Sequence, residues 1–199
     1  MRGIFRRHGR SGKKPRGQSL VEFTIVLPIL LIMISGLIEF GFLLNYYLNL
    51  IDGARDIARF LANSDPSLPD DGLGCDPVHG TAYYPRLVQC YSAQAFGSQT
   101  DFDPATDDIL VSYFSVSGPT VTTYDTWSWY HNHTSEFTPA ELSDMATRAG
   151  AAPDTGFVLV EVFYDYNMIL ALPWITIFVP NPMNLHAYTI MPNAFLSQQ

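Results

Sequence analysis

The sequence predicts an α+β protein, in which one long N-terminal transmembrane helix precedes a small antiparallel β-sheet domain with one short helix. Three observations predict this: a run of sixteen uncharged residues at 23–38, a basic segment before it, and several strand-like runs after residue 107. Sixteen helical residues rise about 24 Å, and a bilayer core is about 30 Å thick. With its apolar flanks, residues 20–44, the run is long enough to span a membrane.

Charge is distributed unevenly along the chain. Residues 1–17 hold seven of the eleven basic residues and no acid, whereas the remainder has four basic and nineteen acidic residues, a net charge of −15. Basic residues beside a membrane helix stay in the cytoplasm, so we expect a cytoplasmic N-terminus and an exported acidic domain at the cell membrane. The alternative is a disordered basic arm that binds nucleic acid or anionic lipid. An acidic body disfavours nucleic-acid binding, because phosphate contacts require Lys and Arg.

A secretory signal peptide is the alternative explanation of the apolar run. The run exceeds the usual apolar core of about 7 to 15 residues and lacks a small-residue cleavage site near its end. We therefore expect the helix to stay in the protein.

Residues 18–62 are expected to form one continuous helix that Pro28 kinks within the membrane. Tyr46 and Tyr47 fall where the apolar run ends, as in an interfacial aromatic belt. Beyond them, apolar residues recur every three or four positions and predict a stripe that packs against the exported domain or a neighbouring subunit. The stripe comprises Ile51, Ala54, Ala58 and Leu61.

Glu22 is the most informative single residue, because it lies just inside the cytoplasmic end of the apolar run. An ionised carboxylate there is costly unless it finds a partner or reaches the interface, so it is a functional hypothesis by default. Cleavage after Gly17 would make Gln18 the first residue and place a new ammonium four residues from Glu22. Type IV pilins use this arrangement.

Four motifs follow one another in residues 16–62: Arg16-Gly17-Gln18-Ser19-Leu20-Val21-Glu22-Phe23, Val26-Leu27-Pro28 with the aliphatic residues after it, Ile38-Glu39-Phe40-Gly41, and Gly53-Ala54-Arg55-Asp56-Ile57-Ala58-Arg59. With these motifs, the segment resembles the TadE-like minor pilins, or pseudopilins, of the tight-adherence (Tad) secretion and type IV pilus system. The resemblance implies a non-enzymatic protein that a prepilin peptidase cleaves between Gly17 and Gln18 and that helps to assemble an adhesive pilus.

The resemblance also implies how assembly works. The Glu22 carboxylate would pair with the Gln18 ammonium of an adjacent subunit, which relieves the cost of burying either charge alone. Phe23 belongs to the same motif, and Pro28 is a point where the helix can bend or melt during assembly. The implied partners are other Tad pilins, the inner-membrane assembly platform and the lipid bilayer.

Residues 63–106 are expected to form a loop-rich region that contains both cysteines. Cys75 and Cys90 are fifteen residues apart, and an exported compartment favours their oxidation. A disulfide between them would contribute roughly 3 kcal/mol in the chain-entropy model. A metal site is the alternative and would need His79 with a further ligand.

Residues 107–199 are expected to form the exported domain. Strand-like runs occur at residues 109–116, 121–129, 157–166, 175–179 and 185–191. Thr138 is a helix cap, Pro139 stands at the first helical position and Glu141 completes a capping box, so a short helix should run to Arg148.

The chain contains no phosphate-binding loop, nucleophile elbow or Cys-x-x-Cys pair, and we expect neither enzymatic activity nor a cofactor. His131 and His133 could bind a metal with Asp125 or Glu136, but two His residues in a polar loop are more often solvated, and no metal site is expected. The paired acids at 70–71 and 107–108 are better explained as solvated loop caps than as an acid–base pair.

Four aromatic residues of the same region could form a sugar- or surface-binding tip, although packing in a core or between subunits explains them better: Tyr124, Trp127, Trp129 and Tyr130. Two further functions compete with the pilin. One is a single-pass membrane protein, uncleaved at Gly17, whose exported domain binds a ligand or partner. The other is a membrane-tethered enzyme, which the lack of a catalytic set disfavours.

Overall fold

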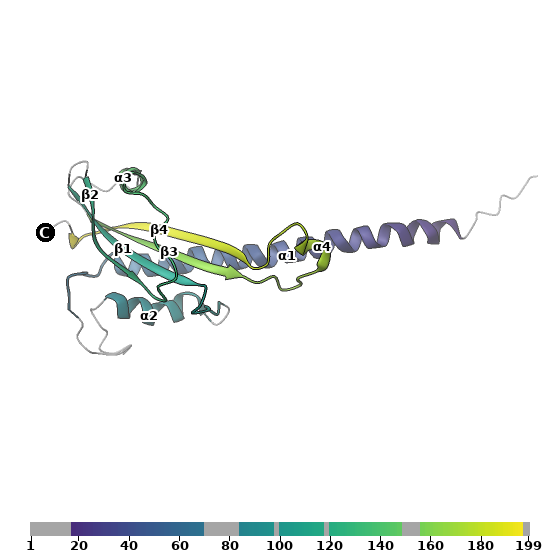
Figure 1. Ribbon diagram of the computed structural model, residues 1–199, viewed down its shortest axis with the longest axis horizontal. Helices are drawn as coiled ribbons and strands as arrows, with labels where there is room; N and C mark the ends of the chain where they lie inside the picture. Colours follow the sequence, from purple (N-terminus) through teal and green to yellow (C-terminus); the bar gives the residue numbers. More distant parts are fainter. Residues whose placement is uncertain (1–16, 70–83, 98–99, 118–119, 149–155, 197–199) are drawn as a thin grey trace, which may run out of the picture. The chain divides into compact units, whose positions relative to one another are not determined.

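The computed structural model describes residues 17–69, 84–97, 100–117, 120–148 and 156–196 (Figure 1). The chain divides into two compact units, Met1–Ile38 and Glu39–Gln199. The long helix α1, Gln18–Leu61, contributes its first half to one unit and its second half to the other. The predicted helix over residues 18–62 is therefore confirmed, and Pro28 lies inside it.

Four antiparallel strands form one sheet: β1 (Asp108–Ser117), β2 (Thr120–Ser128), β3 (Gly156–Tyr166) and β4 (Met183–Asn193). Their order across the sheet is β2-β1-β3-β4, so the strongest predicted strand, β3, is central (Figure 1). The α+β class is confirmed. The edge strand β2 is largely exposed.

The second half of α1 covers one face of the sheet. Its buried side chains share a core with Val111, Val158, Val160 and Val162 of the central strands. The predicted stripe supplies this contact, since Ala54, Ala58 and Leu61 are buried and Ile51 is partly buried; Leu50 and Ile57 are buried with them. The partner of the stripe is therefore the chain's own sheet domain.

The opposite face of the sheet carries a smaller core. Phe114, Phe157 and Leu159 pack there against Leu142 of the helix α3, Pro139–Arg148. The predicted capping box of α3 is present, because the backbone N–H of Thr138 donates to Glu141 Oε2 at 2.9 Å. Both faces of β3 are buried, so its alternating pattern predicted a strand but did not distinguish an outer face.

Three expectations differ from the structure. Residues 63–106 include the helix α2, Tyr84–Ala95, which packs on the α1 side of the core through Tyr84, Leu87 and Val88. Its approach to α1 depends on Gly53, where an added Cβ would lie 2.2 Å from the ring of Phe96. The sequence signal of α2 was weak because polar residues separate its few apolar positions.

The second difference concerns residues 175–179, which are not a strand. Residues 175 and 176 belong to the short helix α4, Pro173–Thr176, and residues 177–179 follow it in the connection between β3 and β4. The β-branched and aromatic composition favours a strand. Within the described part of the chain no strand pairs with this segment, because the paired part of β3 and β4 ends at Tyr166 and Met183. Pro173 instead starts a helical turn, in which the N–H groups of Ile175 and Thr176 donate to the carbonyl of Leu172.

The third difference concerns Tyr46, which was expected in an aromatic belt. Its ring lies 6.0 Å from that of Tyr164 and 5.3 Å from that of Tyr166. Tyr46 therefore packs on the domain core, whereas Tyr47 remains 36% exposed. Both residues follow the apolar run, but consecutive residues of a helix point in different directions, so Tyr46 faces the domain and Tyr47 does not.

Candidate functional site: two acidic residues of the long helix

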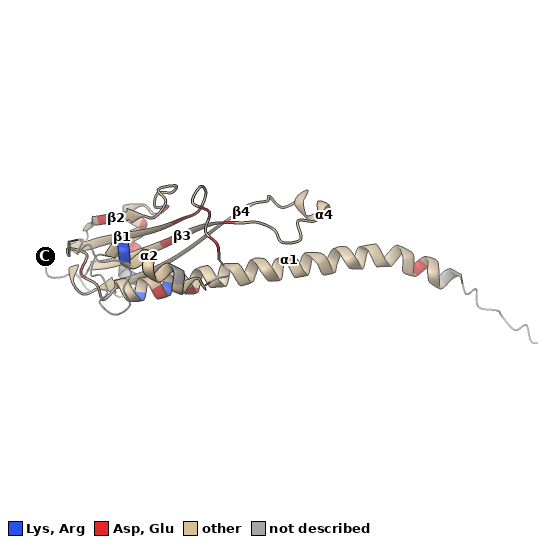
Figure 2. Ribbon diagram, turned by 90° about the horizontal axis from the view of Figure 1, so that it is seen from below, with Lys and Arg blue, Asp and Glu red and all other residues tan. Residues whose placement is uncertain are grey.

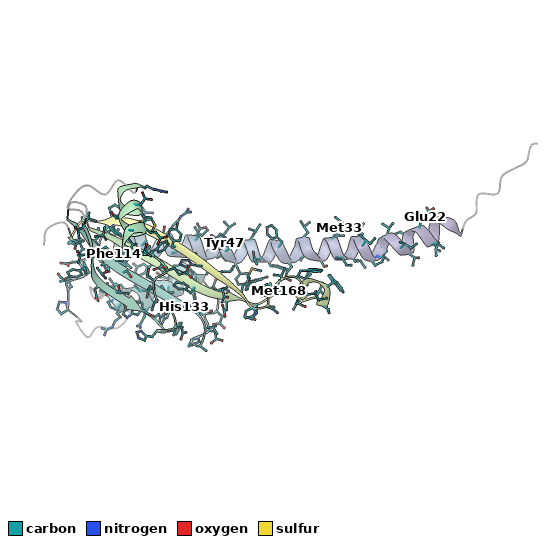
Figure 3. The ribbon with its side chains drawn as sticks, turned by 45° about the horizontal axis from the view of Figure 1, so that its top comes forward. Glu22, Met33, Tyr47, Phe114, His133 and Met168 are labelled. Carbon is teal, nitrogen blue, oxygen red and sulfur yellow. The ribbon has the colours of Figure 1, made fainter. Side chains whose placement is uncertain are left out.

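Glu22 and Glu39 bound the uncharged run of α1. Figure 2 shows this part of the helix without charge, apart from an acidic position near its N-terminal end. Its large apolar side chains are exposed in the structure, and Met33, labelled in Figure 3, is 71% exposed. Among the described residues, α1 is the helix long and apolar enough to cross a membrane. An exposed apolar helix of this length suits a membrane anchor.

The sequence-predicted processing and assembly residues lie in the first turns of α1. Gly17 directly precedes the helix, and its carbonyl accepts the N–H of Val21 at 3.2 Å. Glu22 lies one turn after Gln18, so both positions share a side of the helix. Glu22 and Phe23 are exposed. The structure thus presents Glu22 on the surface of an apolar helix (Figure 3); cleavage and assembly remain predictions, and residues 1–16 lie outside the described part of the chain.

Glu39 has the opposite environment, since it is 5% exposed. Its Oε1 accepts the hydroxyl of Tyr166 at 2.8 Å and the backbone N–H of Ile169 at 2.9 Å, and its Oε2 accepts the N–H of Leu170 at 2.8 Å. A buried carboxylate needs such donors, and hydrogen bonds to an ionised acceptor are stronger than neutral ones. Glu39 therefore ties the end of β3 and the segment after it to α1.

Burial raises the pKa of Tyr166 well above its ordinary value, and the hydrogen bond to Glu39 and the negative charge of Glu39 raise it further. The phenol consequently stays protonated at neutral pH and acts as a donor. Because all three partners of Glu39 donate, the site suits an ionised carboxylate.

Sequence reasoning did not assign Glu39 a role; it used the residue as part of a motif. The available signal was its place inside the expected span of residues 20–44, seventeen residues after Glu22. That spacing corresponds to about 26 Å of helix, close to the thickness of a bilayer core. The identity of its donors was beyond reach, because Tyr166, Ile169 and Leu170 are more than a hundred residues away.

Comparison with known families bears on both acids. Residues 17–59 match the family model described as TadE-like protein. This segment is TadE-like. The resemblance seen in the sequence is confirmed over those residues, which contain Glu22 and Glu39, and the TadE-like match supports a protein associated with the Tad pilus. Neither the curated proteins nor the solved structures gave a match.

Cys90 lies on α2, beyond the segment that matches the TadE-like model. Cys75 and His79 lie outside the described residues. The disulfide between the two cysteines therefore stays a prediction.

Asp107 and Asp108 do cap a loop, but the expectation that they are solvated is wrong, since they are 1% and 0% exposed. Asp108 accepts the Ser128 hydroxyl at 2.6 Å and the N–H groups of Tyr130, Asn132 and His133 at 3.0 Å each. Burial would raise the pKa of Asp108, but these hydrogen bonds together lower it below its usual value. Asp70 and Asp71 lie outside the described residues.

The segment after β2 is thus a structured loop. His133 donates its backbone N–H to Asp108, and its ring lies 4.4 Å from that of Phe163. Among the described residues, no group of three His, Cys, Asp or Glu side chains could hold a metal ion. Trp127 and Trp129 are partly buried against the main core, which supports the packing interpretation of these two aromatics.

Another buried acid lies on the other face of the sheet. Glu161 is 0% exposed, and its Oε1 lies 3.3 Å from His186 Nε2. His186 Nδ1 lies 3.2 Å from Glu136 Oε2, and the N–H of Glu136 donates to Glu161 Oε1 at 3.2 Å. The imidazole therefore lies between the carboxylates of Glu136 and Glu161.

Proposed function

We propose that this TadE-like protein is a non-enzymatic minor pilin, or pseudopilin, of a Tad-type adhesive pilus. The observation that carries the proposal is the TadE-like match, which begins at Gly17 and contains Gln18 and Glu22. The exposed position of Glu22 on an apolar helix supports it, because an ionised carboxylate is costly at the edge of a membrane span and marks a functional position.

In this proposal a prepilin peptidase cleaves between Gly17 and Gln18 and removes the basic leader, residues 1–17. The new ammonium of Gln18 then pairs with Glu22 of an adjacent Tad pilin at the inner-membrane assembly platform. An ion pair stabilises both charges in an apolar environment, where either alone is costly. The basic leader supports a cytoplasmic N-terminus and an exported C-terminal domain.

Phe23 and Pro28 have supporting roles in the proposal. The ring of Phe23 is 62% exposed and would pack against a neighbouring subunit. Pro28 has no N–H to donate to the carbonyl one turn earlier, so α1 has a weak point at which it can bend during assembly. We divide the chain into the leader, the TadE-like helix to residue 62, a disulfide-bearing region to residue 106, and the exported domain to residue 199.

The test compares two acids on the same helix. Glu22→Ala should insert into the membrane at normal abundance and fail to support pilus assembly. Asp52→Ala is the matched control, because Asp52 is an exposed acid of α1 outside the apolar run, and its loss should leave assembly unchanged. Normal piliation by Glu22→Ala would refute the assembly mechanism.

N-terminal sequencing of the membrane-extracted protein tests the processing step. The proposal requires a chain that begins at Gln18. A working protein that retains Met1 would instead support the alternative, an uncleaved single-pass protein whose exported domain binds a ligand or a partner.

A further inference from the structure

We propose that the connection between β3 and β4, residues 167–182, inserts into the outer interface of the bilayer that α1 crosses. We call this segment the interfacial loop. It would give the exported domain a second, monotopic contact with lipid. The inference goes beyond the pilin function and depends on the membrane anchor alone.

The composition of the interfacial loop sets it apart from the acidic domain that carries it. Residues 166–182 contain no Asp, Glu, Lys or Arg, although the chain beyond residue 17 has a net charge of −15. Five of its large apolar side chains are exposed: Ile169 at 51%, Leu170 at 37%, Trp174 at 39%, Ile177 at 76% and Phe178 at 84%. A group of exposed apolar side chains on an exported domain marks an interaction surface.

The interfacial loop has an inner and an outer side. Ile175 and Val179 pack against the main core, while Trp174, Ile177 and Phe178 face outward. Its helical turns also satisfy part of its own backbone: the N–H groups of Phe178 and Val179 donate to the carbonyl of Ile175. A segment at the membrane surface needs this internal satisfaction, because fewer water molecules are available there to pair with backbone groups.

The hydrogen bonds to Glu39 set the depth of the loop. Glu39 follows the uncharged run and lies inside the expected span of residues 20–44. The N–H groups of Ile169 and Leu170 lie 2.9 and 2.8 Å from its carboxylate, so the start of the loop is held at the outer end of that span. Asn181 Oδ1 accepts the N–H of Met168, labelled in Figure 3, at 3.0 Å and closes the base of the loop.

Lipid is the occupant that these observations favour. Phe40 and Phe42 of α1 come directly after Glu39 and are exposed. They extend the apolar surface of the helix to the position at which Glu39 holds the loop. Trp174 has the amphipathic ring that is enriched at the membrane–water interface. The loop has no charged side chain, so its exposed apolar side favours lipid over a charged protein surface.

The experiment uses the full chain, reconstituted in phosphatidylcholine vesicles with and without bromine on the acyl chains. Brominated lipid quenches a tryptophan that lies in the bilayer. We expect lower emission from the wild-type protein in the brominated vesicles. Trp174→Phe should remove most of this loss, because Trp127 and Trp129 pack against the domain core.

Phe178→Asp supplies the second variant, since it places a charge on the most exposed apolar side chain of the loop. It should reduce the quenching of Trp174 without changing the membrane insertion of α1. Phe195→Asp is the matched control: Phe195 is 44% exposed but lies outside the loop, and the quenching should be unchanged.

Equal emission in both kinds of vesicle would overturn the proposal. A second result would also overturn it: Trp174 is protected from a water-soluble quencher, this protection increases with the protein-to-lipid ratio, and brominated lipid does not quench Trp174. A second copy of the chain would then cover the loop. The assay does not require pilus assembly, and Glu22→Ala should give the wild-type result. A failure of the pilin function and a failure of this inference are therefore distinguishable.

Discussion

Replacing Glu39 tests whether this buried carboxylate holds the start of the interfacial loop on α1. Glu39→Ala removes the acceptor of three hydrogen bonds, those from Tyr166, Ile169 and Leu170. A hydrogen bond to a charged group contributes about 1.5–3 kcal/mol. The two backbone donors are partly buried, so water can replace part of their loss. We therefore expect Glu39→Ala to lower the free energy of unfolding by about 3–4 kcal/mol.

Glu39→Gln separates the charge from the shape. The amide oxygen can still accept from Tyr166 and Ile169, but the amide nitrogen then faces the N–H of Leu170, and two donors oppose each other. We expect a loss of about 1.5 kcal/mol. The pKa of Tyr166 should fall in this variant, because a negative charge that raises it has been removed, while burial continues to raise it.

Chemical unfolding of the protein in detergent micelles measures the change in free energy, and amide hydrogen exchange measures the opening of the loop. Exchange of the Ile169 and Leu170 amides should accelerate in Glu39→Ala. Titration of the phenolate absorbance, compared between Glu39→Gln and the wild type, reports on Tyr166.

Asp52→Ala is the matched control for this prediction as well. The Asp52 side chain is 73% exposed and lies 3.5 Å from Arg55, an exposed pair three residues apart. Such pairs contribute under about 0.5 kcal/mol. If Glu39→Ala were as stable as Asp52→Ala, with unchanged exchange at Ile169 and Leu170, Glu39 would not hold the loop.

Three further predictions concern the domain that contains the sheet. Gly53→Ala should destabilise it by about 1–2 kcal/mol, because the new Cβ meets Phe96, whereas Gly41→Ala meets nothing within 4 Å and should be neutral or stabilising in the same unfolding assay. The folded pKa of Asp108 is lowered, so the stability that Asp108 contributes is complete above about pH 3.9 and is lost as the pH falls through the folded pKa. In Asp108→Asn the amides after β2 should be less protected from hydrogen exchange already at neutral pH, and acidification should change that protection little further. Cys90→Ser should cost roughly 3 kcal/mol, as should reduction of the wild type; no effect of either on unfolding would contradict the predicted disulfide.

Local patterns predicted much of the fold. The capping box before α3 and the alternation of Val158, Val160 and Val162 were sufficient to place α3 and β3, because both signals act over a few residues. The prediction failed for residues 175–179, where composition favoured a strand and the absence of a neighbouring strand decided otherwise. A strand requires a hydrogen-bonding partner, and a sequence segment does not contain its partner.

The candidate site was likewise predictable from the sequence only in part. The apolar run, the basic N-terminal segment and the Gly17–Glu22 spacing are properties of neighbouring residues, so the sequence by itself determined the long apolar helix and its TadE-like character. Only the tertiary structure decided that Glu39 is buried and that it holds the start of the interfacial loop. The physical reason is that an acid inside an apolar run requires donors, and the fold supplied them from residues more than a hundred positions away.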